Sequence, residues 1–219
     1  METGVIISMY ELDFLVMFLI VIGFCVTTLT DQWQLIKKVQ GGLKSSVAAG
    51  YNAAMKMMVL NRFGAVMYFS ASAFYIESSG SPSGLVQIYC FALFITLMSL
   101  VAGTLYYFKK SVLVVDFSGH RSFAAASLFA NAFGALGLTA PLIAGVVFLE
   151  YRLLLSNSSF LLNTIYTFIM VFYLEAKMAK LIDMKSESIR AVAFAIITGR
   201  IMGYFLISLL YLYMVLYEF

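Results

Sequence analysis

An arginine stands inside the last long apolar stretch of this sequence, ten residues after Arg190. At about 1.5 Å per residue, a helix that begins near Arg190 would place Arg200 about 15 Å deep, near the middle of a bilayer. A charged side chain at that depth is costly and is by default a candidate functional residue. On a helical wheel, Tyr204, Ser208 and Tyr211 lie on the same side as Arg200. We therefore predict that this side faces protein or water rather than lipid.

A second unusual stretch, 47–64, carries Lys56 and Arg62 in otherwise apolar sequence. On insertion scales each charge costs about 2.5 to 3.5 kcal/mol at the centre of a membrane helix. Snorkelling to the outer headgroups is an alternative for Arg62, but it explains Lys56 and Arg200 together poorly.

Acidic partners for these cations are scarce in the apolar sequence. Glu11 and Asp13 lie near the outer end of the first apolar run and cannot neutralise three deep cations. A surplus of buried positive charge favours an anionic ligand. We expect phosphate to bind Arg200, Lys56 and Arg62. The expected polar lining consists of Tyr51, Asn52, Asn131, Tyr204 and Ser208.

The composition places these residues in a membrane. Of 219 residues, 63% are hydrophobic and 11% are charged, which is typical of polytopic membrane proteins rather than soluble domains. We expect one integral membrane domain, 1–219. The six apolar runs that we interpret as spans are 12–29, 47–76, 85–108, 123–149, 155–174 and 191–216.

Absences narrow the chemistry. The sequence has no phosphate-binding glycine loop, a single histidine, and no cluster of His, Asp and Glu. Cys25 and Cys90 lie in separate apolar runs without neighbouring ligands, which favours buried structural thiols. We therefore expect no enzyme activity, no cofactor, no metal site and no nucleic-acid partner.

The basic residues predict an orientation. Three connections, 31–44, 109–121 and 175–190, hold ten of the 14 lysines and arginines, whereas Arg152 stands alone on the other side. The positive-inside rule makes these connections cytoplasmic and places both termini outside.

An internal match predicts a repeat. The segment 121–134 aligns without gaps with 190–203 and sets Asn131 opposite Arg200. Lys37-Lys38 similarly resembles Lys109-Lys110. The simplest fold is an all-α polytopic protein whose six transmembrane helices form three pseudo-repeated hairpins around an axis along the membrane normal. Pro141 should kink the fourth span.

Several short motifs occur in a particular order along the chain. The first span ends in Leu-Thr-Asp31, an Ala-rich helix carries Tyr51-Asn52 and Asn61-Arg62, and a charged loop leads to Gly199-Arg200-Ile-Met-Gly203. This order resembles the Amj family of lipid II flippases, the alternates to MurJ. The first and last thirds carry the resemblance. It implies six spans, a bacterial inner-membrane location and a polar cavity for the headgroup of undecaprenyl-pyrophosphate-linked peptidoglycan precursor.

Three functions are compatible with these observations. The leading one is a lipid II flippase with a lipid-linked anionic substrate, surrounded by membrane lipids and arranged as a monomer or a homodimer. The second is a secondary transporter or channel for a small anion, or a flippase for another polyprenyl-linked glycan. The third is a non-transporting membrane scaffold in which the charges are structural.

Overall fold

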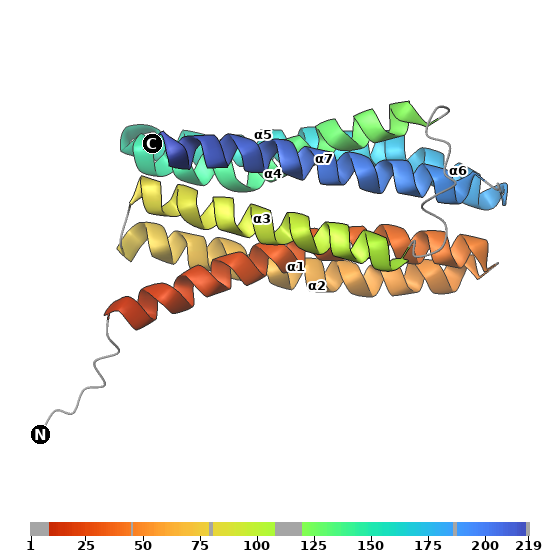
Figure 1. Ribbon diagram of the computed structural model, residues 1–219, viewed down its shortest axis with the longest axis horizontal. Coiled ribbons are helices and arrows are strands. Elements are labelled where there is room, and N and C mark those ends of the chain that lie inside the picture. The colour runs from red at the N-terminus through yellow and green to blue at the C-terminus, as the bar shows by residue number, and fades with distance from the viewer. Residues whose placement is uncertain (1–8, 45, 79–80, 108–119, 186–187, 218–219) are drawn as a thin grey trace, which may run out of the picture.

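The computed structural model describes residues 9–44, 46–78, 81–107, 120–185 and 188–217. These residues are helical nearly throughout and contain no strand. The helices lie side by side in an elongated bundle (Figure 1). The main elements are α1 (Met9–Leu43), α2 (Val47–Ser78), α3 (Pro82–Tyr107), α4 (Arg121–Val147), α5 (Arg152–Phe168), α6 (Ala176–Asp183) and α7 (Ile189–Leu216).

Two short irregular elements complete the chain. The 3-10 turn η2 (Leu149–Tyr151) precedes α5, and the π-helical segment η3 (Ile169–Glu175) joins α5 to α6 without a break. Together α5, η3 and α6 form one long rod. Among the described residues, five helical stretches are long and apolar enough to cross a membrane: 13–43, 82–107, 121–147, 157–183 and 189–216. This all-α architecture is compatible with a multi-pass membrane protein.

The first helix extends well beyond the predicted span, 12–29. It continues through Asp31 to Leu43, because apolar residues keep facing inward after Asp31. Ile36 and Val39 are each only 1% exposed, and Gly41-Gly42 are the first residues after Asp31 with a low helix propensity. The predicted charged connection is therefore largely helical, and Asp31 lies inside the bundle. The other predicted spans agree with α2, α3, α4 and α7 to within a few residues, and the fifth extends over the α5–α6 rod.

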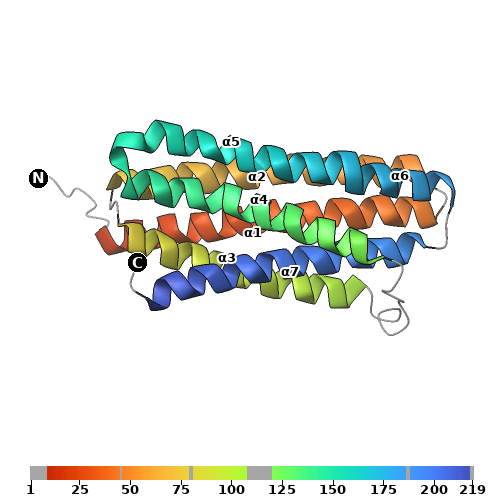
Figure 2. The ribbon, with the colours of Figure 1, turned by 90° about the horizontal axis from the view of Figure 1, so that it is seen from above.

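The helices form two layers of three. In one layer α1 lies between α2 and α3, and in the other α4 lies between α5 and α7 (Figures 1 and 2). The contact between α3 and α7 joins the layers. Consecutive helices α3 and α4 touch little, so the packing groups the helices in threes rather than in the three predicted hairpins.

Small residues bring α1 and α2 into close contact. A methyl group on Gly23 would lie 2.6 Å from the Tyr68 amide nitrogen, and one on Gly64 would lie 2.8 Å from Thr27 Oγ1. Further along, Gly50 meets Gly41 backbone to backbone. Close approach through small residues is how helices associate where no water drives them together.

The ends of the bundle differ in charge. The α1–α2 and α6–α7 connections lie at one end. The α2–α3 and α4–α5 turns lie at the other, with the start of α1 and the end of α7 (Figure 1). Lys44 and Lys185 are exposed at the first end. Lys109 and Lys110 lie outside the described residues.

Candidate functional site

Asp31 is the centre of a polar cluster that joins the two layers. Its Oδ1 accepts hydrogen bonds from Asn61 Nδ2 at 2.9 Å and Gln34 Nε2 at 3.4 Å. Its Oδ2 accepts one from Tyr166 OH at 3.0 Å. The partners come from α1, α2 and α5, so the carboxylate is held from three helices. Sequence reasoning placed Asp31 in a connection and missed both Asn61 and Tyr166 as its partners.

Arg200 lies beside this cluster and is 2% exposed. Its guanidinium attracts the Asp31 carboxylate, and it acts electrostatically on Tyr166 and Tyr204. Nevertheless, Arg200 Nε and Nη1 are buried without a hydrogen-bond partner. The expectation that no acid lies near the deep cations is therefore wrong for Arg200, because α1 carries Asp31 into the interior.

The π-helical segment η3 sets the register of this cluster. Tyr166 and Glu175 both face α1, since Tyr166 contacts Asp31 and Glu175 Oε1 forms a 2.7 Å ion pair with Lys38 Nζ. In an uninterrupted α-helix a separation of nine residues would correspond to about two and a half turns and would put the two side chains on opposite sides. The wider π turns remove this offset. Such insertions are frequent at functional sites.

The predicted stripe on α7 lies in the interior. Tyr204 is 6% exposed, and Ser208 Oγ donates to the Tyr204 carbonyl at 2.8 Å. Tyr211 OH donates to Thr139 Oγ1 of α4, with 2.6 Å between the oxygens. These side chains make protein contacts within the bundle, at successive levels above Arg200.

Asn131 is also buried, on the face of α4 that meets α7. Its Nδ2 donates to the Ser127 carbonyl at 2.7 Å. A methyl group on Gly203 would lie 3.3 Å from Asn131 Cβ, one turn of α7 from Arg200. The structure thus brings Asn131, Tyr204, Ser208 and Arg200 into one interior region.

The remaining predicted residues lie elsewhere. Tyr51, Asn52, Lys56 and Arg62 are all exposed on α2. Because Asn61 faces Asp31, the next residue, Arg62, is rotated about 100° away from the interior. The three predicted cations are therefore not gathered at one point: Arg200 is inside, and Lys56 and Arg62 are on an outer face.

Side chains of neighbouring helices donate to two adjacent carbonyls of α4 beside Pro141. Proline has no N–H for the carbonyl four residues earlier. That carbonyl, of Gly137, accepts from Ser159 Oγ of α5 at 2.6 Å, and the adjacent Leu138 carbonyl accepts from Tyr68 OH of α2 at 2.8 Å. The interruption is thus satisfied by side chains from both layers, and α4 continues to Val147.

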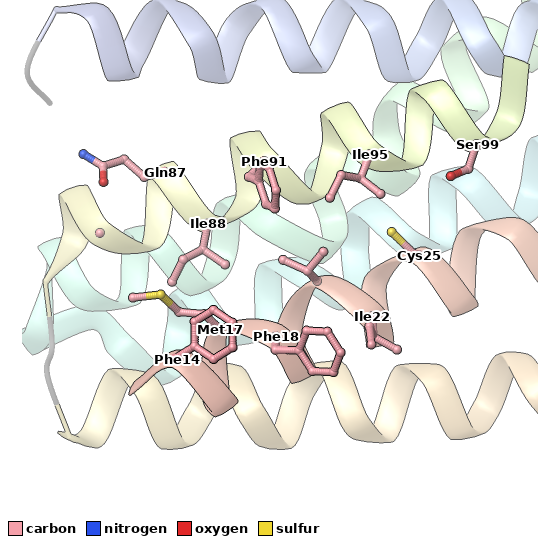
Figure 3. Close-up of a pocket in the computed structure, with 12 residues that line it drawn as sticks. Phe14, Met17, Phe18, Ile22, Cys25, Gln87, Ile88, Phe91, Ile95 and Ser99 are labelled. Atoms are coloured by element: carbon pink, nitrogen blue, oxygen red, sulfur yellow. The ribbon is translucent and has the colours of Figure 1, made fainter. Parts of the chain in front are cut away.

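An apolar groove of about 690 Å³ lies between the first halves of α1 and α3 (Figure 3). Phe18, Ile22, Phe91 and Ile95 line it, and it reaches Cys25, whose Sγ lies 3.2 Å from Thr96 Oγ1. Phe24, the neighbour of Cys25 on α1, packs the edge of its ring against Tyr204, with 6.5 Å between the ring centroids. The Cys25 end of the groove therefore lies near the polar cluster.

No family model, curated protein or solved structure matches the chain. Within the described part of the chain, no three His, Cys, Asp or Glu side chains gather where they would hold a metal ion. The site is defined by a buried cation with free donors, a carboxylate held beside it, and an apolar groove that ends next to both.

Proposed function

We propose that the chain is a flippase for a lipid with a pyrophosphate-linked headgroup, of the lipid II type. The observation that carries the proposal is the pair of unpartnered donors, Nε and Nη1, on the buried guanidinium of Arg200. A buried donor without an acceptor costs about 1 to 3 kcal/mol, and more when it is charged. A phosphate oxygen would remove this penalty with charge-assisted hydrogen bonds.

The resemblance noted in the sequence supplies the substrate class, and the groove adds an apolar site beside the cation. A polyprenyl pyrophosphate has both parts, a long hydrocarbon chain and an anionic headgroup. We assign the phosphates to Arg200 during the crossing. Lys56 and Arg62 would bind the headgroup on the outer face of α2 before or after that step, because they lie apart from Arg200.

We further propose six crossings in the bacterial cytoplasmic membrane, with α2 as the sixth and both termini outside. The charges at the α1–α2 and α6–α7 end support this orientation through the positive-inside rule. The cations of α2 account for its lower hydropathy. Lys56 and Arg62 are exposed near the middle of α2, where lipid would otherwise surround them. Because charged side chains are costly in lipid, we expect substrate or a second copy of the chain to cover this face.

A transporter for a small anion is the second candidate. The enclosure of Arg200, which is 2% exposed, favours it. A small anion could bind Arg200 Nε and Nη1 without the wide passage that a sugar headgroup needs. It would not use the α1–α3 groove.

Complementation tests the proposal. In a bacterium depleted of its lipid II flippase, we expect the wild-type chain to restore growth and Arg200→Ala to fail at normal membrane abundance. Loss of one charge-assisted bond weakens binding by about 1.5 to 3 kcal/mol. Arg200→Lys should rescue partly, since lysine keeps the charge without the planar fork. Arg121→Ala, at an exposed arginine of α4, is the matched control and should rescue fully.

The other outcomes separate the alternatives. If a well-expressed wild-type chain does not rescue, lipid II is not the substrate, and uptake of small anions into vesicles becomes the next assay. If Arg200→Ala rescues fully at normal abundance, Arg200 has a structural role and the flippase mechanism proposed for it is wrong.

A further inference from the structure

The two layers are related by a constant shift along the sequence. The helix α2 covers 47–78 and the α5–α6 rod covers 152–183, so both ends differ by 105 residues. The same shift takes the end of α1, Leu43, to within one residue of the end of α4, Val147. It also takes α3 onto α7 to within a few residues. Each layer is therefore a three-helix unit with the same order. The helix lengths agree closely except at the start of the first helix, since α1 has 35 residues and α4 has 27.

Side-chain contacts follow the same shift. Asp31 accepts from Asn61 in the first unit and from Tyr166 in the second. Asn61 and Tyr166 are 105 residues apart, so they occupy equivalent positions on α2 and on the α5–α6 rod. The carboxylate of Asp31 lies where the two units meet.

The units run in opposite directions. Cys25 pairs with Thr96 and Gln32 with Thr104, so α1 and α3 are parallel. In the second unit α4 and α7 are also parallel, because Gly199 meets Ala124 and Gly203 meets Leu128. Between the units, α3 and α7 are in contact and run antiparallel (Figure 1). The second unit is therefore inverted relative to the first.

Equivalent interfaces of the two units differ in one respect. In the second unit Ser127 Oγ donates to the Ile196 carbonyl at 2.6 Å, and α4 and α7 touch through small residues. The residues 105 positions earlier are Ile22 and Phe91, which both line the groove between α1 and α3 (Figure 3). The same helix pair is thus closed in one unit and open in the other, at opposite ends of the bundle.

We infer that the α1–α3 groove and the α4–α7 interface are equivalent binding sites for the hydrocarbon chain of a lipid. The first is open and the second is closed in this structure, and we infer that the two sites open alternately. This inference rests on the proposed flippase function. Inverted repeats are the basis of alternating access in many transporters, with the substrate near their interface. Here that interface holds Asp31 and Arg200.

The occupant follows from the surroundings of the groove. Its walls are mostly Phe, Ile and Met side chains, and the open side is flanked by the exposed side chains of Phe14, Phe18 and Phe91. The flanking stretches, 13–43 and 82–107, are the most apolar of the five candidate spans, so a lipid chain is the material next to them. The Cys25 end of the groove lies beside Phe24, whose ring packs against Tyr204, so this end directs the polar head of the lipid towards Arg200.

The interface between α4 and α7 consists of contacts that allow the two helices to separate. Lipid is as apolar as a helix surface, so no hydrophobic force holds α4 against α7. Their association depends on close packing at Gly199 and Gly203 and on the Ser127 hydrogen bond. A hydrocarbon chain that enters between them replaces the packing contacts with others of the same kind, at the cost of the Ser127 hydrogen bond.

Distance measurements between spin labels test the alternation. In a Cys25→Ser, Cys90→Ser background reconstituted in nanodiscs, Phe14→Cys with Ser83→Cys reports the α1–α3 opening. Ser122→Cys with Arg190→Cys reports the α4–α7 opening, and all four positions are exposed. Adding undecaprenyl pyrophosphate should shift the two distance distributions in opposite directions. Undecaprenol, which has the same chain without the phosphates, should leave both unchanged.

A wedge variant tests the same inference without lipid. A methyl group on Gly199 would overlap the Ala124 carbonyl and lie 2.9 Å from Ser127 Cβ. Gly199→Ala should therefore lengthen the Ser122–Arg190 distance and shorten the Phe14–Ser83 distance. The matched control is Gly103→Ala on α3, where the added methyl would meet only Gln32 Nε2 at 3.7 Å. It should move neither distance.

The outcomes distinguish this inference from the proposed function. If both distances stay fixed with lipid and with Gly199→Ala, while binding of undecaprenyl pyrophosphate still depends on Arg200, the alternation is wrong and the function stands. If Gly199→Ala shifts the distances but the lipid neither binds nor shifts them, the alternation stands and the lipid assignment is overturned. A diazirine in the prenyl chain should crosslink to α1 and α3, and crosslinks confined to α2 would overturn the groove as its site.

Discussion

Asp31 and Arg200 attract each other at the junction of the two layers, yet Arg200 Nε and Nη1 have no hydrogen-bond partner. The oxygens of Asp31 are occupied by Asn61 and Tyr166 instead. The carboxylate thus compensates the charge of Arg200 without using these two donors. An arginine held in this way is neutralised enough to remain folded inside the bundle and still has donors for an anion.

Removing the charge of Asp31 should destabilise the bundle more than removing both charges. We expect Asp31→Asn to lower the free energy of unfolding by about 3 kcal/mol, because it leaves a buried arginine without its counter-charge. Adding Arg200→Gln should recover part of that loss. Denaturant unfolding of the purified protein in detergent measures both. Asp183→Asn, at an exposed position, is the control. A double variant that is less stable than Asp31→Asn would show that the two charges do not compensate each other.

The phenol of Tyr166 should contribute through its bond to Asp31. Tyr166→Phe keeps the ring against Gly134 but removes the donor to Oδ2. Hydrogen bonds to charged groups contribute about 1.5 to 3 kcal/mol, so we expect a loss of that size in the free energy of unfolding. Tyr213→Phe on the exposed side of α7 should change it little. Equal effects of the two variants would mean that Tyr166 does not hold the carboxylate.

The sequence was sufficient to predict the all-α class and most helix boundaries, because apolar runs bounded by charged or glycine-rich segments leave few choices. It was also sufficient to single out Arg200, since one arginine in a long apolar run is conspicuous. It was not sufficient for Asp31, whose basic neighbours Lys37 and Lys38 made the segment read as a connection. The feature that favours a helix after Asp31 is the spacing of Ile36 and Val39. They are three residues apart and so lie on the same face of a helix.

The relation between the halves could not be predicted for a different reason. The match of 121–134 with 190–203 compares two helices that lie side by side in the same unit, α4 and α7. Shared small residues there reflect their close packing, at Gly199 and Gly203 for example. The 105-residue shift is visible in helix lengths and contacts, whereas equivalent residues such as Asn61 and Tyr166 differ in type. The exposed positions of Lys56 and Arg62 likewise depend on the rotation of α2, which its contact with Asp31 fixes.

Labelling of single cysteines tests the proposed orientation. In a background without Cys25 and Cys90, Lys44→Cys and Lys185→Cys should react with a membrane-impermeant thiol reagent only after the cells are opened. Ser83→Cys, at the opposite end of the bundle, should react in intact spheroplasts. The reason is that the basic end of the bundle stays in the cytoplasm. The reverse pattern would overturn the orientation while leaving the fold unchanged.

Because Pro141 interrupts the hydrogen bonds of α4, we predict that the effects of substituting Ser159 and Pro141 on stability are coupled. Ser159 Oγ donates to the Gly137 carbonyl, which has no backbone donor because residue 141 is proline. We expect Ser159→Ala to lower the free energy of unfolding by about 0.6 kcal/mol, the average for hydrogen bonds between membrane helices, and by no more than about 1.7 kcal/mol, their maximum. Thr164→Ala is the control, since its hydroxyl bonds within α5 to Phe160 and is exposed.

The same substitution should have little effect when residue 141 can donate. In a Pro141→Ala background the new N–H would bond to the Gly137 carbonyl, so the serine hydroxyl would no longer be its main donor. The double-mutant cycle isolates this coupling from any cavity that Pro141→Ala itself creates. If Ser159→Ala lowers stability equally in both backgrounds, the serine acts through packing alone. If the loss disappears with Pro141→Ala, the Ser159 hydroxyl replaces the backbone N–H that residue 141 lacks. The free carbonyl of Gly137 then holds α5 against α4.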